Sequence, residues 1–144
     1  MINPAKALRL SVAGLVVGLA AALPAAAQTG TTYDCRFEVS GAHMGWLPAT
    51  VILSHTAGET TAQARDPSIE GPEGGPYEVK VETDNAKRTT FTLRRKSKSS
   101  TNQPVTVNYR LTVMKADLSA TLSAKLLGYT NSYLARGQCE RRNG

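Results

Sequence analysis

The chain has few of the side chains that catalysis and metal binding use most often. Its 144 residues include two cysteines, two histidines and one tryptophan. These counts exclude most metal centres and most nucleophile–histidine arrangements. No serine stands in GxSxG or SxxK surroundings, and the glycine-rich stretch 71–76 contains two prolines, which lack the N–H groups of a phosphate cradle. We therefore expect a protein that is not an enzyme and holds no metal or cofactor.

The two imidazoles do not alter that expectation. His43 lies in the glycine-containing stretch 40–45, and His55 stands at the end of an apolar run. Neither has a cysteine, a histidine or a carboxylate at the spacing that metal ligands show. We expect both side chains to face solvent.

The N-terminus carries an apolar run of 14 residues without charge, residues 10–23. Lys6 and Arg9 precede it, and Pro24 and three alanines follow it, which is the pattern of a signal peptidase site. Fourteen helical residues span about 21 Å, short of the roughly 30 Å hydrocarbon core. We expect residues 1–27 to be a cleaved signal peptide, and the mature protein to be periplasmic or secreted without a transmembrane segment.

The mature chain, residues 28–144, is of single-domain size. Its 117 residues retain 15 basic and 11 acidic side chains, a net charge of +4 against +6 for the whole sequence. Across the whole sequence, 19% of residues are charged and 41% are hydrophobic, as in folded proteins, which excludes a disordered chain. We expect one domain and a monomer.

The two cysteines stand near the two ends of that domain. An oxidising compartment favours a bridge between Cys35 and Cys139, and their separation lacks the CxxC arrangement of redox enzymes. A bridge closing 105 residues restricts the unfolded chain by about 4 to 5 kcal/mol in the loop-entropy treatment. We expect this disulfide to be structural.

Apolar and polar residues alternate along most of the mature chain. This period of two predicts strands that are polar on one face, as in antiparallel sheets. Sustained helical periodicity is missing outside the signal, although 119–127 is rich in good helix formers. The expected strands cover residues 31–39, 47–55, 60–65, 77–83, 89–95, 105–114, 119–127 and 131–140.

The predicted fold class is all-β, an antiparallel eight-stranded meander closed as a small β-barrel. A bridge between Cys35 and Cys139 requires the first and last strands to be neighbours, because the Cα atoms must lie about 5 to 6 Å apart. Such pairing closes a meander and removes both edges. A β-sandwich with its terminal strands paired in one sheet is the alternative. The interior of an eight-stranded barrel is either filled by side chains or holds one small ligand.

A basic cluster is the most distinctive charged feature. It lies at one strand and the following polar segment, and its positive field would reach about 8 Å in physiological salt. It favours contact with an anionic envelope component or a partner protein. Nucleic acid is not expected, because no aromatic residues interleave with the charges. The candidate basic surface consists of Lys87, Arg88, Arg94, Arg95, Lys96 and Lys98.

A second candidate site surrounds the single tryptophan. Trp46 precedes a strand, where it either caps one barrel mouth or lines a pocket. We expect His43, Trp46 and Tyr77 to form the pocket rim. The Pro- and Gly-rich loop 66–76 is the candidate for an inhibitory element if the protein blocks a hydrolase.

Two resemblances accompany these patterns. The string from Thr83 to Phe91, with Tyr109–Thr112 and Cys139, resembles small exported proteins of alphaproteobacteria, a group without an assigned activity that implies no functional residue. Tyr33-Asp34-Cys35 is similar to the opening of the periplasmic c-type lysozyme inhibitors, which are β-barrels. Their Ser-Gly-x-x-Tyr motif is matched only in its first two positions, by 40–44, and too early in the chain. A basic protein is also a poor partner for a cationic lysozyme.

Three functions follow, in order of preference. The first is a non-enzymatic exported β-barrel that contacts an anionic envelope component or a partner protein. The second is a carrier of a small hydrophobic ligand inside the barrel, and the third is an inhibitor of a secreted hydrolase. A barrel interior packed completely with side chains would exclude the carrier.

Overall fold

The computed structural model describes residues 30–43 and 45–143, and nearly all of them belong to strands or to the turns between strands. The signal peptide expected over residues 1–27 lies outside the described residues. No helix among the described residues has the length and apolar character needed to cross a lipid bilayer.

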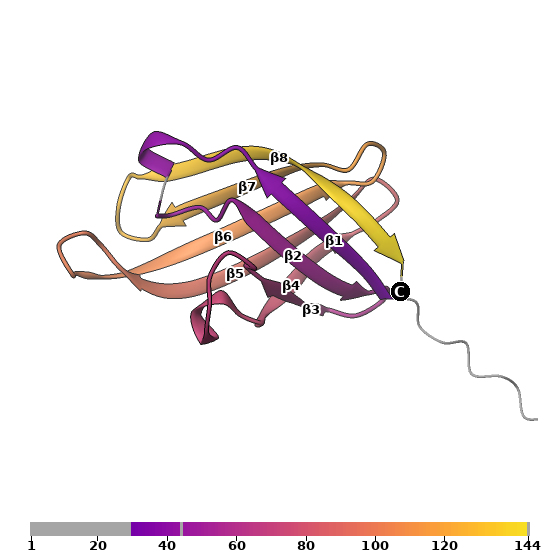
Figure 1. Ribbon diagram of the computed structural model, residues 1–144, viewed down its shortest axis with the longest axis horizontal. Helices are drawn as coiled ribbons and strands as arrows, with labels where there is room; N and C mark the ends of the chain where they lie inside the picture. The colour runs from indigo at the N-terminus through magenta and orange to yellow at the C-terminus, as the bar shows by residue number, and fades with distance from the viewer. Residues whose placement is uncertain (1–29, 44, 144) are drawn as a thin grey trace, which may run out of the picture.

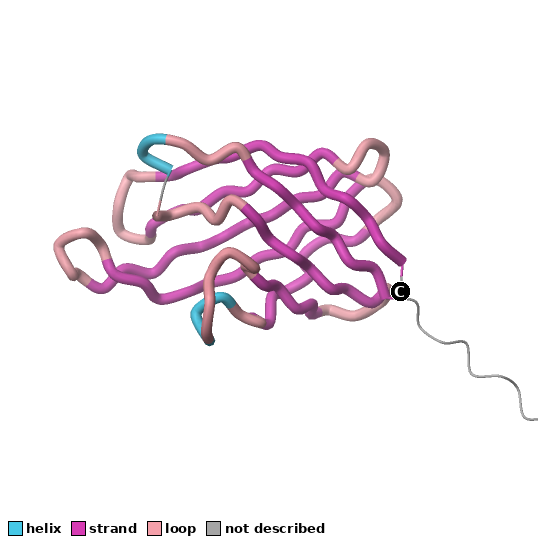
Figure 2. Tube along the Cα trace, viewed as in Figure 1, coloured by secondary structure: helices cyan, strands magenta, loops and turns pink. Residues whose placement is uncertain are grey.

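Eight antiparallel strands follow one another along the chain, as the alternation predicts (Figure 1). Short 3-10 turns occur only at η1, Gly41–His43, and η2, Pro72–Gly74, within the described chain (Figure 2). The strands are β1 Gly30–Phe37, β2 Thr50–Thr56, β3 Thr61–Arg65, β4 Tyr77–Asp84, β5 Arg88–Lys98, β6 Pro104–Met114, β7 Ser119–Leu126 and β8 Ser132–Asn143.

Two strands run further than their apolar residues indicate. The expected strands cover residues 89–95 and 105–114, but β5 extends to Lys98 and β6 begins at Pro104. The turn is therefore confined to 99–103, where Ser99 and Gln103 are joined by a backbone hydrogen bond of 2.9 Å. Hydrogen bonds between the two strands, rather than burial, hold this polar extension in a ladder. The ambiguous segment 119–127 contains a strand, β7, as expected.

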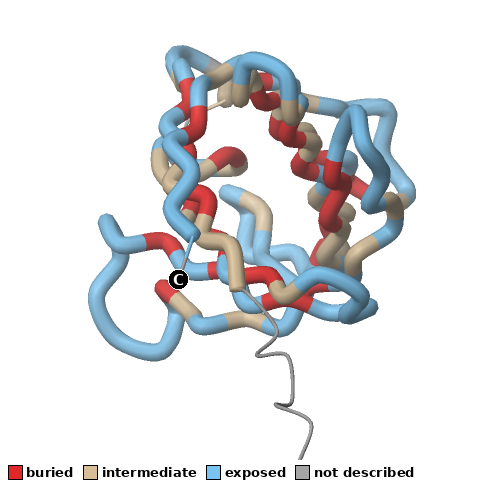
Figure 3. Tube along the Cα trace, turned by 90° about the vertical axis from the view of Figure 1, so that its right-hand side faces the viewer, coloured by how far each residue is buried: buried red, intermediate tan, exposed pale blue. Residues whose placement is uncertain are grey.

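Pairing of the first and last strands closes the sheet into a barrel, which excludes the sandwich. Each strand pairs with the next, and β1 pairs with β8 (Figure 3, viewed along the barrel). Cys35 lies directly opposite Cys139 in that pairing, and the two form the disulfide, with 4.0 Å between their Cα atoms. The closed barrel and its disulfide are thus confirmed. Closure gives each of the eight described strands a paired neighbour on both sides.

The barrel interior contains the apolar residues of each alternating strand. Tyr33, Cys35 and Phe37 of β1 are buried, and Arg36 between them is exposed. Gly137 of β8 lies opposite Phe37, and a Cβ atom at Gly137 would overlap the Arg36 carbonyl oxygen and crowd the Phe37 ring. A glycine at this position therefore lets β1, β8 and a large aromatic ring fit together.

The two ends of the barrel differ in construction. At one end, the loop end, lie the connections 38–49, 66–76, 99–103 and 127–131; at the other, the turn end, lie 57–60, 85–87 and 115–118. Gly30 and Asn143, where the described chain begins and finishes, both lie at the turn end (Figure 1).

Candidate ligand-binding cavity

A cavity of about 450 Å³ occupies the barrel interior toward the loop end. It forms beside the shortest strand: β3 has five residues, against eleven in each of β5 and β6. Because β3 finishes early, the wall above it is built by loop residues rather than by a strand. The exposed residues Ile69 and Glu73 of that loop stand at the edge of the cavity, which is therefore open to solvent.

The floor of the cavity is apolar. Leu53 of β2, Phe91 of β5 and Leu122 of β7 line it, and Phe91 is only 2% exposed. Tyr33 and His55 pack their rings edge-on against Phe91, with centroids 6.4 and 5.7 Å away, and neither lines the cavity. Phe91 thus separates the cavity from the packed interior at the turn end.

The loop 66–76 is held against the cavity by Asp66, which is buried at the end of β3. Its carboxylate accepts hydrogen bonds from the Thr50 hydroxyl at 3.3 Å and from the Ser68 backbone N–H and hydroxyl at 2.9 and 2.5 Å. Its backbone N–H donates to the Gly74 carbonyl oxygen at 2.7 Å. A Cβ atom on Gly74 would overlap the Ile69 carbonyl oxygen, so only glycine permits this tight loop. The segment expected to be an inhibitory element therefore forms part of the cavity wall.

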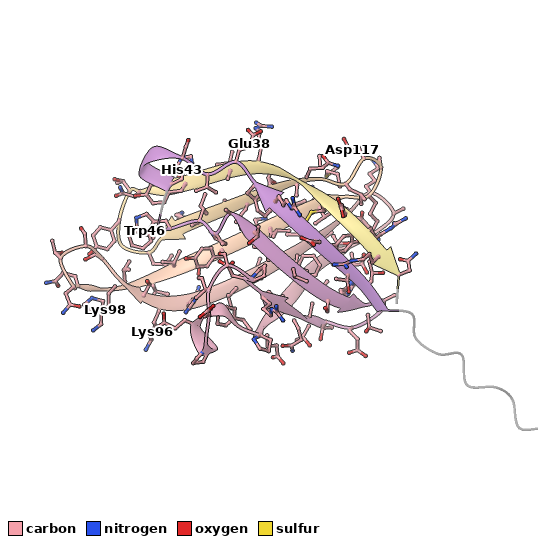
Figure 4. All side chains as sticks on the ribbon, viewed as in Figure 1. Glu38, His43, Trp46, Lys96, Lys98 and Asp117 are labelled. Carbon is pink, nitrogen blue, oxygen red and sulfur yellow. A yellow bond between two sulfur atoms is a disulfide. The ribbon has the colours of Figure 1, made fainter. Side chains whose placement is uncertain are left out.

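An aromatic group stands at the mouth of the cavity. Trp46 lies parallel to Tyr133 of β8, with centroids 6.1 Å apart and 8° between the planes. His43 packs edge-on against the same Tyr133 ring, with 5.8 Å between the two ring centroids. Figure 4 shows His43 and Trp46 at the loop end. Of the three residues expected at the pocket rim, Trp46 and Tyr77 line the cavity, and His43 lies beside it without lining it.

A polar cluster, made of Tyr77, Arg95 and Tyr109, lies in the cavity wall. Arg95 is opposite the buried Val107 in the β5–β6 pairing, so its side chain enters the barrel, where its guanidinium carbon lies 4.6 Å from the centroid of the Tyr77 ring. The Tyr77 hydroxyl is buried without a hydrogen-bond partner among the described residues, which costs about 1 to 3 kcal/mol. Burial raises the pKa of Tyr109, although the positive charge of Arg95 opposes the rise.

This placement separates Arg95 from the other members of the candidate basic surface. Arg94 faces outward, and its Nε donates to the Asn108 side-chain oxygen at 3.0 Å. Lys96 and Lys98 are exposed at the loop end, as Figure 4 shows. Lys87 and Arg88, which were expected to belong to the same basic surface, stand at the turn end of the same strand. The six residues therefore occupy three places: the cavity, the outer face at the loop end, and the turn end.

His55 differs from the expectation that it faces solvent. It is 6% exposed, in phase with the buried Val51 and Leu53 of β2, and its Nε2 lies 4.0 Å from Asp84. Burial by itself raises the pKa of Asp84, but hydrogen bonds from Lys115 and Thr89 outweigh it and leave the pKa below its ordinary value. This polar group belongs to the turn end, on the far side of Phe91 from the cavity.

Comparisons with known proteins provide no relative from which a function could be inferred, so a proposal has to rest on the geometry of the cavity. No protein-family model, no curated protein and no solved structure matches the chain. The two resemblances given above stay predictions. Among residues 30–43 and 45–143, no three His, Cys, Asp or Glu side chains gather in the manner of metal ligands.

Proposed function

We propose that this protein is an exported, non-enzymatic binding protein that holds a small, predominantly apolar ligand inside its barrel. The observation that carries the proposal is the cavity of about 450 Å³, which is open at the loop end and has an apolar floor. Small-molecule sites have volumes of about 300 to 1,000 Å³ and are mostly apolar with a few polar groups. The disulfide supports the exported location, because such bonds persist in oxidising compartments.

The cavity changes the order of the three functions expected from the sequence. A ligand carrier required an interior that is not completely packed, and this interior is open between Trp46 and Phe91. Inhibition of a secreted hydrolase requires the loop 66–76 to act on a partner, and several residues of that loop line the cavity instead. Inhibition stays a prediction that no described contact favours.

A neutral fluorescent probe tests the proposal directly. N-phenyl-1-naphthylamine, which brightens in apolar surroundings, should bind the mature protein saturably with one probe per chain. Ala64 lines the cavity and its neighbour Gln63 is exposed on the outer face of β3. Ala64→Phe should reduce probe binding tenfold or more, because the added ring occupies space that the probe needs. A tenfold loss corresponds to about 1.4 kcal/mol of binding free energy. Gln63→Phe introduces the same side chain outside the barrel and should leave binding unchanged.

Folding controls keep that comparison decisive. Far-UV circular dichroism and thermal melting establish that each variant is folded before its binding is measured. If Ala64→Phe does not fold, Ala49→Phe replaces it, because Ala49 also lines the cavity and is exposed. Absence of saturable binding to the wild type, or equal binding by the cavity and outer-face variants, contradicts the proposal.

A second candidate function is contact between the loop end and an anionic lipid surface of the envelope. It is favoured by Lys96 and Lys98, which are exposed beside the cavity mouth, and none of the ion pairs within the described chain includes either of them. Each lysine contributes about 1 kcal/mol near such a surface. Replacing both Lys96 and Lys98 with Ser should therefore cost about 2 kcal/mol, which corresponds to about thirtyfold weaker binding to phosphatidylglycerol vesicles.

The turn end supplies the matched control for that measurement. Replacing Lys87 and Arg88 with Ser removes the same charge from the opposite end of β5. Co-sedimentation with vesicles should be weakened by the loop-end pair and much less by the turn-end pair. Equal effects of the two double variants would mean that net charge, not the loop end, governs the contact.

A further inference from the structure

The cavity contains one feature that an apolar site does not need: the guanidinium of Arg95, which has no acidic partner among the described residues. Arg95 enters the barrel from β5, and none of the ion pairs or side-chain hydrogen bonds found within residues 30–43 and 45–143 includes it. Its side chain contacts the Tyr77 ring, and its charge acts on Tyr109, but neither of these groups carries a carboxylate. Charged groups that are partly removed from water normally pair with an opposite charge.

The carboxylates nearest the cavity do not provide that charge. Asp66 lines the cavity, and its Oδ1 atom already accepts hydrogen bonds from Thr50 and Ser68. Glu73 is exposed at the edge of the cavity. Neither forms an ion pair with Arg95. Within the part of the chain that the structure describes, no acidic group pairs with Arg95, so its guanidinium is free to bind an acceptor on a ligand.

The surroundings of Arg95 hold the guanidinium in place for such an acceptor. The guanidinium carbon lies over the Tyr77 ring, 4.6 Å from its centroid, and the backbone of Arg95 is held by the β5–β6 ladder opposite Val107. The hydroxyl of Tyr77, whose ring contacts the guanidinium, is buried, and a charge-assisted hydrogen bond is stronger in such surroundings than in bulk water. A carboxylate matches the fork with two parallel hydrogen bonds.

We propose that the ligand is an amphiphilic carboxylate, with its charged head bound by Arg95 and its apolar body on the floor formed by Leu53, Phe91 and Leu122. This inference rests on the proposed function and adds the chemical class of the ligand. The geometry assigns the two parts to different walls: the cation lies on β5 toward the loop end, and the floor lies deeper in the barrel. Arg95 is a binding residue in this assignment, and Tyr77 positions it.

Matched probes separate this inference from the proposed function. Decanoate and 1-decanol have the same chain length and differ in the charge of the head. An apolar cavity alone prefers the neutral alcohol, because an ionised carboxylate loses hydration on entry. With Arg95 as partner, decanoate should bind about tenfold to a hundredfold more tightly than 1-decanol, the range expected of hydrogen bonds to a charged group. Isothermal titration calorimetry measures both affinities, and quenching of the single tryptophan, Trp46, gives a second readout.

Two neighbouring arginines provide the variant and its control. Arg95→Gln should abolish the preference for decanoate and leave 1-decanol binding within about twofold. Arg94→Gln removes the same charge from the outer face and should retain the preference. A wild type that binds 1-decanol as tightly as decanoate overturns the inference while the proposed function stands, and so does a preference that survives in Arg95→Gln. Binding of neither probe, together with no binding of the naphthylamine, overturns both.

Discussion

Removal of the disulfide is the perturbation whose magnitude follows most directly from the structure. Cys35 and Cys139 join β1 to β8 across a sequence separation of 104, so the bridge constrains nearly the whole described chain. In the loop-entropy treatment such a cross-link raises the free energy of unfolding by about 4 to 5 kcal/mol. Both side chains are buried, at 0% and 2% exposed, so the Cys35→Ala/Cys139→Ala variant also loses packing and should not lose less than this.

Urea unfolding followed by circular dichroism measures that loss. The double variant should keep the far-UV spectrum of the wild type, because the β1–β8 ladder flanks the bridge on both sides. Its unfolding midpoint should fall, and the dependence of its free energy on urea should rise, since an unlinked unfolded chain exposes more surface. Dithiothreitol should destabilise the wild type similarly and leave the variant unchanged. A loss below about 1 kcal/mol would refute the reasoning.

Three further outcomes are expected. Gly137→Ala should lower the free energy of unfolding by about 1 to 3 kcal/mol in urea titrations, because the added methyl group has to displace Phe37 or the strand beside it; an unchanged midpoint contradicts this. Phe91→Ala should cost about 3 to 5 kcal/mol in the same assay, and a cost near zero would show that the ring is not packed as described. The pKa of Asp84 is lowered by folding from 3.8, so the stability that Asp84 contributes is present above that value and is lost as the pH falls through the folded-state pKa. Asp84→Asn should therefore be less stable than the wild type at pH 6, and the difference should shrink toward about pH 2; a constant difference argues against this titration.

Strand alternation and the two cysteines together predicted which strands lie side by side. Tyr33, Cys35 and Phe37 are in phase, and Tyr133, Ala135 and Cys139 are in phase, so a bridge between the two cysteines brings the first and last strands together. That reasoning uses only the period of a strand and the reach of a disulfide, both of which are local. The pairing of the first and last strands was therefore predictable before any tertiary contact was known, and the closed barrel was preferred over a sandwich that would pair them in the same way.

The same alternation also predicts that the side chain of Arg95 faces the barrel interior, although its charge suggested an exposed position. Phe91 and Leu93 face the interior, and Arg95 continues their phase by two residues. It was grouped with Arg94 and Lys96 because a run of basic residues is typical of an exposed segment. His55 is a parallel case, since it continues the phase of Val51 and Leu53. For both residues, the two-residue period of the strand predicted correctly that the side chain faces inward, whereas its polarity suggested that it faces solvent.

The cavity itself could not be derived in this way. Whether an eight-stranded barrel is filled depends on the summed volumes of side chains from different strands and on how far each strand extends. The short β3 and the fold of the loop 66–76, fastened by Asp66, decide the outcome here. These are relations between distant segments, and no period along the sequence reports them.

The position of the two described chain ends has a practical consequence for any attachment to the protein. The two ends of the described chain, Gly30 and Asn143, lie together at the turn end (Figure 1). The cavity opens at the loop end. A tether joined to either end holds the barrel with its entrance facing away from the point of attachment. Immobilising the protein on a sensor surface through one terminus therefore leaves the entrance accessible, and a fusion partner placed there stays about a barrel's length from an entering molecule.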